Sequence, residues 1–202
     1  MNTNKISISN GNSKMGKIPS VSLPPIVTCA KGCTCAKKCY AAKLCRIYKT
    51  VREAYNRNLE VLYTDPVKYW EQVNDVLSVS RFFRFHVSGD IPNAVYLYDM
   101  ILSAEKNPHC EILVFTKRYD IVNEWLSDPS HKIPENLHVI FSEWDGMNME
   151  NPHNLPVAHV IFKGNEPEPH WNICPGNCME CAKAHVNCWA LQNGQHVAFY
   201  EH

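Results

Sequence analysis

Residues 81–117 read RFFRFHVSGDIPNAVYLYDMILSAEKNPHCEILVFTK. The first ten residues are rich in aromatic side chains and end in Ser-Gly-Asp, which is typical of a strand that runs into a turn. In segment 93–108 the apolar residues recur at helical spacing, and an Asn-Pro pair stops the pattern. Segment 110–117 is a second short apolar run, which predicts another strand. A strand, a helix and a strand in this order indicate a parallel sheet with a right-handed crossover.

The same alternation continues toward the C-terminus. We expect a short helix at 120–128, a third strand at 136–144, a fourth at 157–164 and a last strand at 196–200. A closed eight-fold barrel needs about 200–250 residues, so four or five strands are too few to complete one. The sequence therefore predicts an α/β fold, either a partial (β/α) barrel or a small parallel sheet, with N-terminal helices and cysteine-rich termini.

Two helices are expected before the first of these strands. The first covers 37–63, and the second covers 66–78 and starts after Asp65 as its N-cap. The apolar stripe of the first helix predicts a buried face, formed by Leu44, Tyr48, Val51, Tyr55, Leu59 and Leu62. Segment 31–57 also carries eight lysines and arginines against one glutamate. This basic segment could stabilise a thiolate group, face the phosphates of a nucleic acid, or be a solvated helix face.

The composition is that of a globular protein, which we expect to form a single domain over 1–202. Hydrophobic residues make up 45% of the chain and charged residues 20%, and the formal net charge is zero. A zero net charge gives the whole molecule no general attraction for nucleic acid or membrane. No segment approaches the ~20 apolar residues of a membrane helix, and the N-terminus lacks the apolar run of a signal peptide. These observations predict a cytoplasmic protein with no membrane partner.

Cysteine is unusually abundant, with ten residues in the chain. Nine of them form two groups, which are Cys29, Cys33, Cys35, Cys39 and Cys45 near the N-terminus and Cys174, Cys178, Cys181 and Cys188 near the C-terminus. Only Cys110 stands apart. In a reducing cytoplasm, clustered thiols indicate metal ligands. The alternative is a disulfide framework, which would require an exported protein.

The spacing of the first group favours an iron–sulfur cluster over a zinc site. Zinc sites usually take two separated pairs of cysteines, whereas iron–sulfur clusters take several closely spaced thiolates. We expect Cys29, Cys35 and Cys39 to be ligands, with Cys33 or Cys45 as the fourth. If only three thiolates bind a four-iron cluster, one iron stays open to a substrate or cofactor.

The second group begins with CPGNCMEC at residues 174–181. Cys188 follows closely enough to complete a four-thiolate site, which would then be closed. Pro175 and Gly176 supply a turn that can wrap backbone amides around sulfur. Zinc is the alternative metal here, and His185 could then replace a cysteine.

Polar residues follow the predicted strands at their carboxyl ends, where parallel α/β sheets bind ligands. We expect catalytic roles for Asp90, Lys117 and Glu143, and cofactor binding by Ser88, Gly89, Asp90 and Lys117. Gly89 could let a ligand approach the backbone closely. Lys117 could hold a carboxylate or phosphate, neutralise a cluster, or pair with Asp90. The alternative for all these residues is capping of the next helix.

Several segments together resemble a known family. They are GNSKMGKIPSVSLPP at 11–25, CYAAK at 39–43, HVSGD at 86–90, FTK at 115–117 and CW at 188–189. Over nearly its whole length the chain resembles the phage and mobile-element proteins of the gene-product-eighty-eight family. The resemblance implies a mobile-element or bacterial cytoplasmic origin, and it implies no particular activity.

A looser similarity is to radical S-adenosylmethionine enzymes. These enzymes combine a partial (β/α) barrel, a three-cysteine cluster and a glycine-rich turn after an early strand. Here Ser88-Gly89-Asp90 would be that turn, and the three-then-two spacing of CPGNCMEC is the one such enzymes use. The similarity implies S-adenosylmethionine as a cofactor.

We therefore expect an iron–sulfur protein with two four-iron clusters, one with an open iron and one auxiliary. Its expected activity is that of a redox or radical S-adenosylmethionine-like enzyme, with a small-molecule substrate or an electron donor as its partner. One alternative is a metal-stabilised nucleic-acid-binding module, for which the basic segment is the motivation. Another is an electron carrier or redox sensor that has no substrate site.

Overall fold

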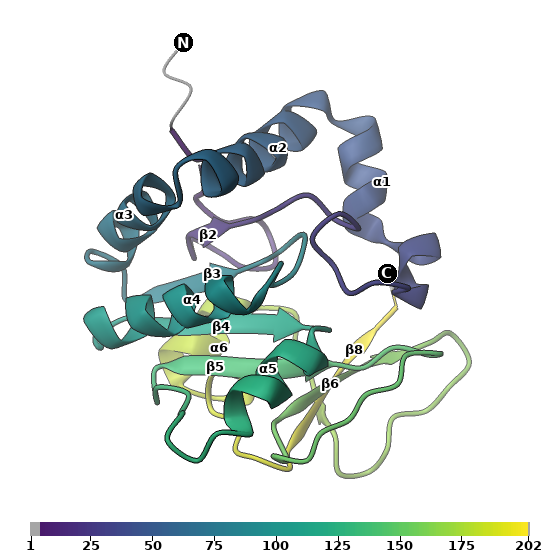
Figure 1. Ribbon diagram of the computed structural model, residues 1–202. Helices are drawn as coiled ribbons and strands as arrows, with labels where there is room; N and C mark the ends of the chain where they lie inside the picture. The colour runs from purple at the N-terminus through teal and green to yellow at the C-terminus, as the bar shows by residue number, and fades with distance from the viewer. Residues whose placement is uncertain (1–4, 202) are drawn as a thin grey trace.

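The structure is a computed structural model that describes residues 5–201 and contains one eight-stranded sheet, in the order β1-β2-β3-β4-β5-β6-β8-β7 (Figure 1). The strands are β1 (Ile8–Ser9), β2 (Ser20–Val21), β3 (Phe82–Phe85), β4 (Glu111–Thr116), β5 (Leu137–Ser142), β6 (Val157–Ile161), β7 (Asn172–Ile173) and β8 (His196–Tyr200). Every neighbouring pair is parallel except β1 and β2. The edge strands β1 and β7 do not pair with each other, so the sheet is open. The α/β prediction is confirmed, with a mostly parallel sheet that is not closed into a barrel.

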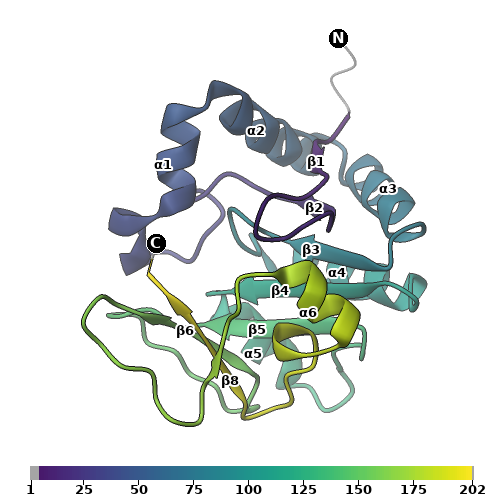
Figure 2. The ribbon, with the colours of Figure 1, turned by 180° about the vertical axis from the view of Figure 1, so that it is seen from behind.

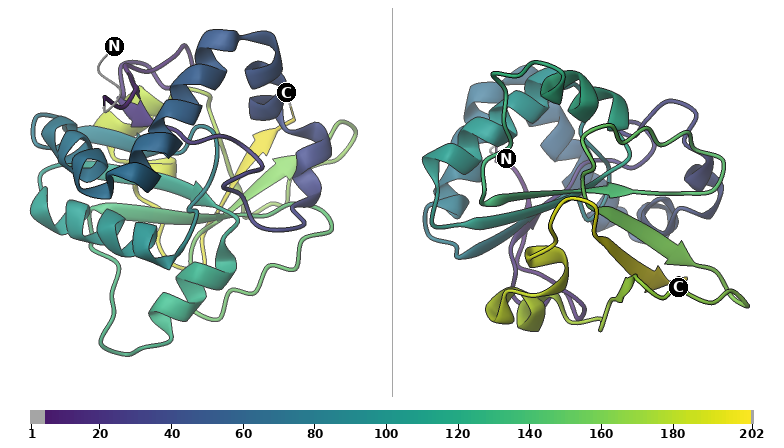
Figure 3. Two further views of the ribbon diagram at one scale, coloured as in Figure 1. Left: turned by 45° about the horizontal axis from the view of Figure 1, so that its top comes forward. Right: turned by 90° about the horizontal axis from the view of Figure 1, so that it is seen from below.

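The two faces of the sheet carry layers of unequal size, as the views from behind and from below show (Figures 2 and 3). The larger layer contains α2 (Lys49–Thr64), α3 (Pro66–Leu77), α4 (Ala94–Lys106) and α5 (Tyr119–Leu126). The smaller layer is the C-terminal tail, with α6 (Cys178–Ala184) and the 3₁₀ helix η2 (Asn187–Trp189). Helix α1 (Tyr40–Ile47) and the 3₁₀ helix η1 (Thr34–Lys38) lie beyond the sheet, on the side toward which β4 points (Figure 1).

Alternation along the central strands builds one core on each face. Ile112 and Val114 of β4 contact the core beneath the helices, whereas Leu113 contacts the core beneath the tail. In the same way, Phe83 of β3 belongs to the first core and Phe82 to the second. Because both faces are covered, the central strands are apolar nearly throughout, as is typical of parallel sheets.

The expected helix at 37–63 is interrupted. Tyr48 takes an extended conformation, with ψ 104°, and separates α1 from α2. The first part of the apolar stripe is also exposed, since the exposed fractions of Leu44 and Tyr48 are 38% and 53%, whereas Leu62 is buried. Helical spacing shows that one face is apolar, but it does not show how much of that face meets the core. Here only the C-terminal half of α2 does so.

The other helix expected near the N-terminus is confirmed. It corresponds to α3, and the carboxylate of Asp65 accepts a hydrogen bond from the N–H of Lys68 at 3.0 Å, as an N-cap should. Asn93 caps α4 in the same way, through the N–H of Tyr96 at 2.9 Å. Within residues 5–201, no helix is both long enough and apolar enough to span a membrane.

Candidate functional site

A cavity of about 420 Å³ lies at the carboxyl ends of the parallel strands and along the sheet face that the C-terminal tail covers. Thr116 and Ser142 line it at the strand ends, and Leu113 and Phe199 line it on the tail side. The cysteines that line it are Cys29, Cys33, Cys35, Cys39, Cys174, Cys178, Cys181 and Cys188. The two cysteine groups, which lie near opposite ends of the chain, therefore share one cavity.

Local hydrogen bonds position the first cysteine group. Cys39 is the N-cap of α1, and its Sγ accepts a hydrogen bond from the N–H of Ala42 at 3.4 Å. Cys29 Sγ accepts one from a backbone N–H three residues earlier, at 3.3 Å. Cys33 Sγ and Cys35 Sγ lie 2.7 Å apart. Backbone N–H donors of this kind also surround the sulfur ligands of metal centres and tune them.

The second cysteine group is attached both to the sheet and to the N-terminal loop. The N–H of Cys174 donates to a carbonyl of β8 at 2.9 Å, and the N–H of Cys178 donates to the carbonyl of Lys14 at 2.9 Å. Cys178 is the first residue of α6. Cys181 and Cys188 complete the set of four thiols at the cavity. The tail is thus held against residues from the other end of the chain.

Two of the candidate ligands lie outside the cavity. Cys45 is in α1 and does not line the cavity, and the exposed His185 does not line it either. Cys110, which the sequence already set apart, is buried in the core beneath the helices. The structure therefore brings Cys33, and not Cys45, together with the three ligands expected in the first group.

Burial raises the pKa of some of the cavity thiols. It raises the pKa of Cys29 to about 11, and it raises the pKa of Cys35 and of Cys188 to about 12. The positive charge of Lys117 opposes the pKa shift at Cys35, and that of Arg84 opposes it at Cys188. A thiol with so high a pKa becomes a ligand when a metal cation takes the place of its proton.

The thiols at the cavity are not gathered around one metal ion. In the described part of the chain, no three His, Cys, Asp or Glu side chains converge closely enough to hold a single ion. The available donors are soft sulfur atoms, which suit iron–sulfur clusters and other thiolate-bound metals. Backbone N–H groups and the cations Lys117 and Arg84 lie beside them, which favours an anionic thiolate cluster.

Asp90 organises the turn that follows β3. Its carboxylate accepts hydrogen bonds from Thr116 Oγ1 at 2.6 Å, from the N–H of Lys117 at 2.8 Å and from the N–H of Ile91 at 2.8 Å. Burial raises the pKa of Asp90, and these hydrogen bonds oppose that shift. The carboxylate thereby ties the ends of β3 and β4 together beside the cavity.

The other two residues expected to be catalytic are separated from each other. Lys117 lines the cavity, where its Nζ donates a hydrogen bond to Ser142 Oγ at 2.6 Å. Glu143 does not line the cavity, and its carboxylate lies 2.5 Å from Nδ1 of His159. His159 Nε2 lies in turn 2.8 Å from His196 Nδ1. Lys117 therefore lines the cavity directly, whereas Glu143 contacts it only through His159, which is a lining residue.

Ser88 and Gly89 line the cavity, but the fold already uses both. Ser88 Oγ donates a hydrogen bond to the carbonyl of Leu23 at 3.1 Å. Gly89 has φ 79°, and a Cβ at this position would lie 2.7 Å from the same carbonyl oxygen. The glycine thus allows another backbone segment to approach closely. The role of these two residues in cofactor binding stays a prediction.

Two further residues at the cavity were not expected. Arg84 of β3 places its guanidinium 4.9 Å from the centroid of the Phe115 ring. His86 follows β3 with φ 58°, is buried, and has no hydrogen-bond partner among residues 5–201 for either ring nitrogen. Alternation in the strand FFRF places Arg84 on the same face as Phe82. The sequence did not show that the tail would cover this face.

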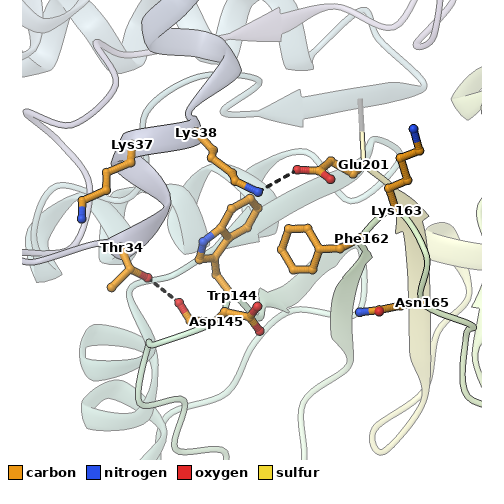
Figure 4. A pocket seen from close by; sticks show the side chains of 9 residues that line it. All are labelled: Thr34, Lys37, Lys38, Trp144, Asp145, Phe162, Lys163, Asn165 and Glu201. Carbon is orange, nitrogen blue, oxygen red and sulfur yellow. Dashed lines mark hydrogen bonds and ion pairs between the residues drawn. The ribbon is translucent and has the colours of Figure 1, made fainter.

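A second cavity, of about 600 Å³, adjoins the first (Figure 4). Lys38, Trp144 and Glu201 line both cavities. Lys38 Nζ lies 3.1 Å from Glu201 Oε1, and Trp144 meets Phe162 edge to face with 5.5 Å between ring centroids. An exposed ion pair and an aromatic side chain thus stand between the cysteine-lined cavity and this outer one.

Comparison with known proteins places the chain in a family. No curated protein and no solved structure matches it significantly. The expected similarity to radical S-adenosylmethionine enzymes therefore has no support. The family model described as Gene product 88 matches residues 1–194 of the 202. Because this match covers nearly the whole sequence, the protein belongs to the Gene product 88 family, as its motifs predicted.

Proposed function

We propose that this protein is an iron–sulfur redox enzyme whose two cysteine groups each hold a cluster beside one substrate cavity. The observation that carries the proposal is that eight cysteines from opposite ends of the chain line the same cavity at the carboxyl edge of the sheet. This edge is where open α/β sheets bind their ligands. S-adenosylmethionine is not part of the proposal.

The donor set favours a cluster over zinc. A structural zinc site needs four ligands arranged tetrahedrally around one point. The first group here is instead a run of closely spaced cysteines, four of which line the cavity, and this pattern suits a cluster. Zinc bound after rearrangement of the side chains is the competing outcome of the experiment below.

In the first group, Cys29 and Cys39 would be ligands together with one of Cys33 and Cys35. The last two sulfur atoms are 2.7 Å apart, too close to bind different irons of one cluster without moving. Three thiolates on a four-iron cluster would leave one iron open toward the cavity. When bound, such a cluster supplies electrons one at a time. Lys117, at 2.6 Å from Ser142 Oγ, would hold its positive charge beside this group.

The test is iron and acid-labile sulfide analysis of protein purified without oxygen. Two filled clusters predict about eight iron atoms per chain. We expect the double variant Cys35→Ser/Cys39→Ser to lose about half of the iron, and Cys178→Ser/Cys188→Ser to lose the other half. Cys45→Ser is the matched control, because Cys45 lies outside the cavity, and it should keep the full amount. Colourless protein with stoichiometric zinc would contradict the proposal.

Nucleic-acid binding is a second candidate function, favoured by the corner between α1 and α2. Ile47 and Tyr48 are 57% and 53% exposed there, and Lys43 and Arg46 are exposed beside them. Phosphate contacts by such cations weaken with salt. We expect Lys43→Gln/Arg46→Gln to lower the slope of log affinity against log salt by about 2, measured by anisotropy with labelled DNA and RNA. The control Lys106→Gln should not change it, and absence of binding at low salt would exclude this function.

A further inference from the structure

We propose that the cysteine-lined cavity binds a small organic molecule through a carboxylate or phosphate group held by Arg84. This inference deepens the proposed function, because it names the substrate class of the same cavity. It starts from the position of Arg84 on β3, which is a central strand of the sheet. No acidic side chain within residues 5–201 forms an ion pair with Arg84.

The guanidinium of Arg84 is held in place, but its Nε lacks a hydrogen-bond partner among residues 5–201. Its Nε is buried and has no hydrogen-bond partner in the described chain. The face of the Phe115 ring lies against the group, 4.9 Å from its carbon to the ring centroid, which restricts its orientation. A half-buried cation without a partner carries a desolvation cost that a bound anion would offset. Arginine presents N–H groups in a fork that matches a carboxylate or a phosphate.

Arg84 lines the cavity together with residues of both cysteine groups. Cys39 and Tyr40 belong to one wall, and Cys178 and Cys188 belong to the other. Tyr40 follows Cys39 directly, so it belongs to the wall of the first cysteine group. An anion bound at Arg84 would therefore lie between the two cysteine groups.

The acidic residues of the cavity are engaged elsewhere. The carboxylate of Asp90 accepts three hydrogen bonds at the turn, and Glu201 forms the ion pair with Lys38. Lys14 adds a second cation on the tail side, 4.9 Å from the centroid of the Phe199 ring. The cavity thus offers a positive centre that its own acids do not neutralise.

The rest of the wall determines what the anion is attached to. Leu113, Phe115 and Phe199 line the cavity next to Arg84 and Lys14. Apolar walls with a few polar groups are typical of small-molecule sites, where the polar groups fix the orientation. The expected ligand is therefore a small carboxylic acid or phosphate ester with an apolar body.

Isothermal titration calorimetry on the anaerobically purified full chain, titrated at low salt with benzoate and with inorganic phosphate, tests this proposal. We expect wild-type protein to bind at least one of the two, and Arg84→Gln to weaken that binding about tenfold or more. Arg84→Lys keeps the charge without the fork and should weaken it less. Arg81→Gln is the matched control, since Arg81 also lies over a phenylalanine ring, at 5.2 Å, but outside the cavity.

Iron analysis of the same samples separates this proposal from the proposed function. If neither anion binds wild-type protein, or if Arg84→Gln binds as tightly as wild type, Arg84 is not an anion site. If Arg84→Gln loses iron and keeps its anion affinity, the arginine serves only the thiolates and the proposal is wrong. Anion binding that depends on Arg84 in a protein without iron would support the binding site and contradict the iron–sulfur function.

Discussion

At the scale of the residue, His86 carries a buried imidazole that does not accept a proton easily. Burial and, as the smaller cause, the positive charge of Arg84 lower the pKa of His86 to about 3. The unfolded chain binds a proton on this histidine below about pH 6.5, whereas the folded chain does not until about pH 3. The stability that His86 contributes is therefore complete above pH 6.5 and is lost as the pH falls from 6.5 toward 3.

This shift predicts that His86 causes part of the acid sensitivity of the fold. Between pH 7 and 5.5 it should lower the free energy of unfolding by about 1 kcal/mol. In His86→Asn, which tolerates the positive φ of 58°, that part of the loss should disappear. Urea denaturation at the two pH values measures the change, with the exposed His109→Asn as control. An unchanged pH dependence in His86→Asn would show that this histidine does not stay neutral in the folded chain.

At the scale of the element, strong local patterns predicted the central part of the fold. The expected helix at 93–108 corresponds to α4 and the expected strand at 110–117 to β4, because each carries its own periodicity. Strands β1, β2 and β7 have two residues each, and of these only β1 lies in a segment, KISIS at 5–9, whose sequence suggests a short strand. They exist because neighbouring segments pair with them. This is why eight strands form where four or five were expected.

The candidate site was predictable to the extent that it follows from the strand ends. Asp90 and Lys117 lie together at the cavity because parallel strands bring their carboxyl ends to one edge. Glu143 also follows a strand end but does not line the cavity; its carboxylate contacts His159, which does line it. Arg84 could not be predicted as a site residue, because only the folded tail turns its face of the sheet into a cavity wall.

At the scale of the whole molecule, the cavity joins the two ends of the chain. Cys178 donates its N–H to Lys14, and a Cβ on Gly16 would lie 2.7 Å from Cβ of Met179, so the tail packs tightly on the N-terminal loop. The loop with the first cysteine group is attached through Thr34, whose hydroxyl donates to the carbonyl of Asp145 at 2.6 Å. Metal bound to both groups would add to these few contacts, because ligand binding to the folded state alone stabilises it.

Metal removal is therefore expected to loosen both cysteine segments together and to leave the central sheet intact. After anaerobic chelation, amide hydrogen exchange should become about tenfold faster in 29–39 and 174–188, while β4 and β5 stay protected by the two cores that cover them. The Cys45→Ser protein, chelated in parallel, should behave as wild type does. Faster exchange in one segment alone would mean that only one group binds metal. Faster exchange throughout β4 and β5 would mean that the whole fold depends on the metal for its stability. We do not expect this, because an apolar core covers each face of these strands.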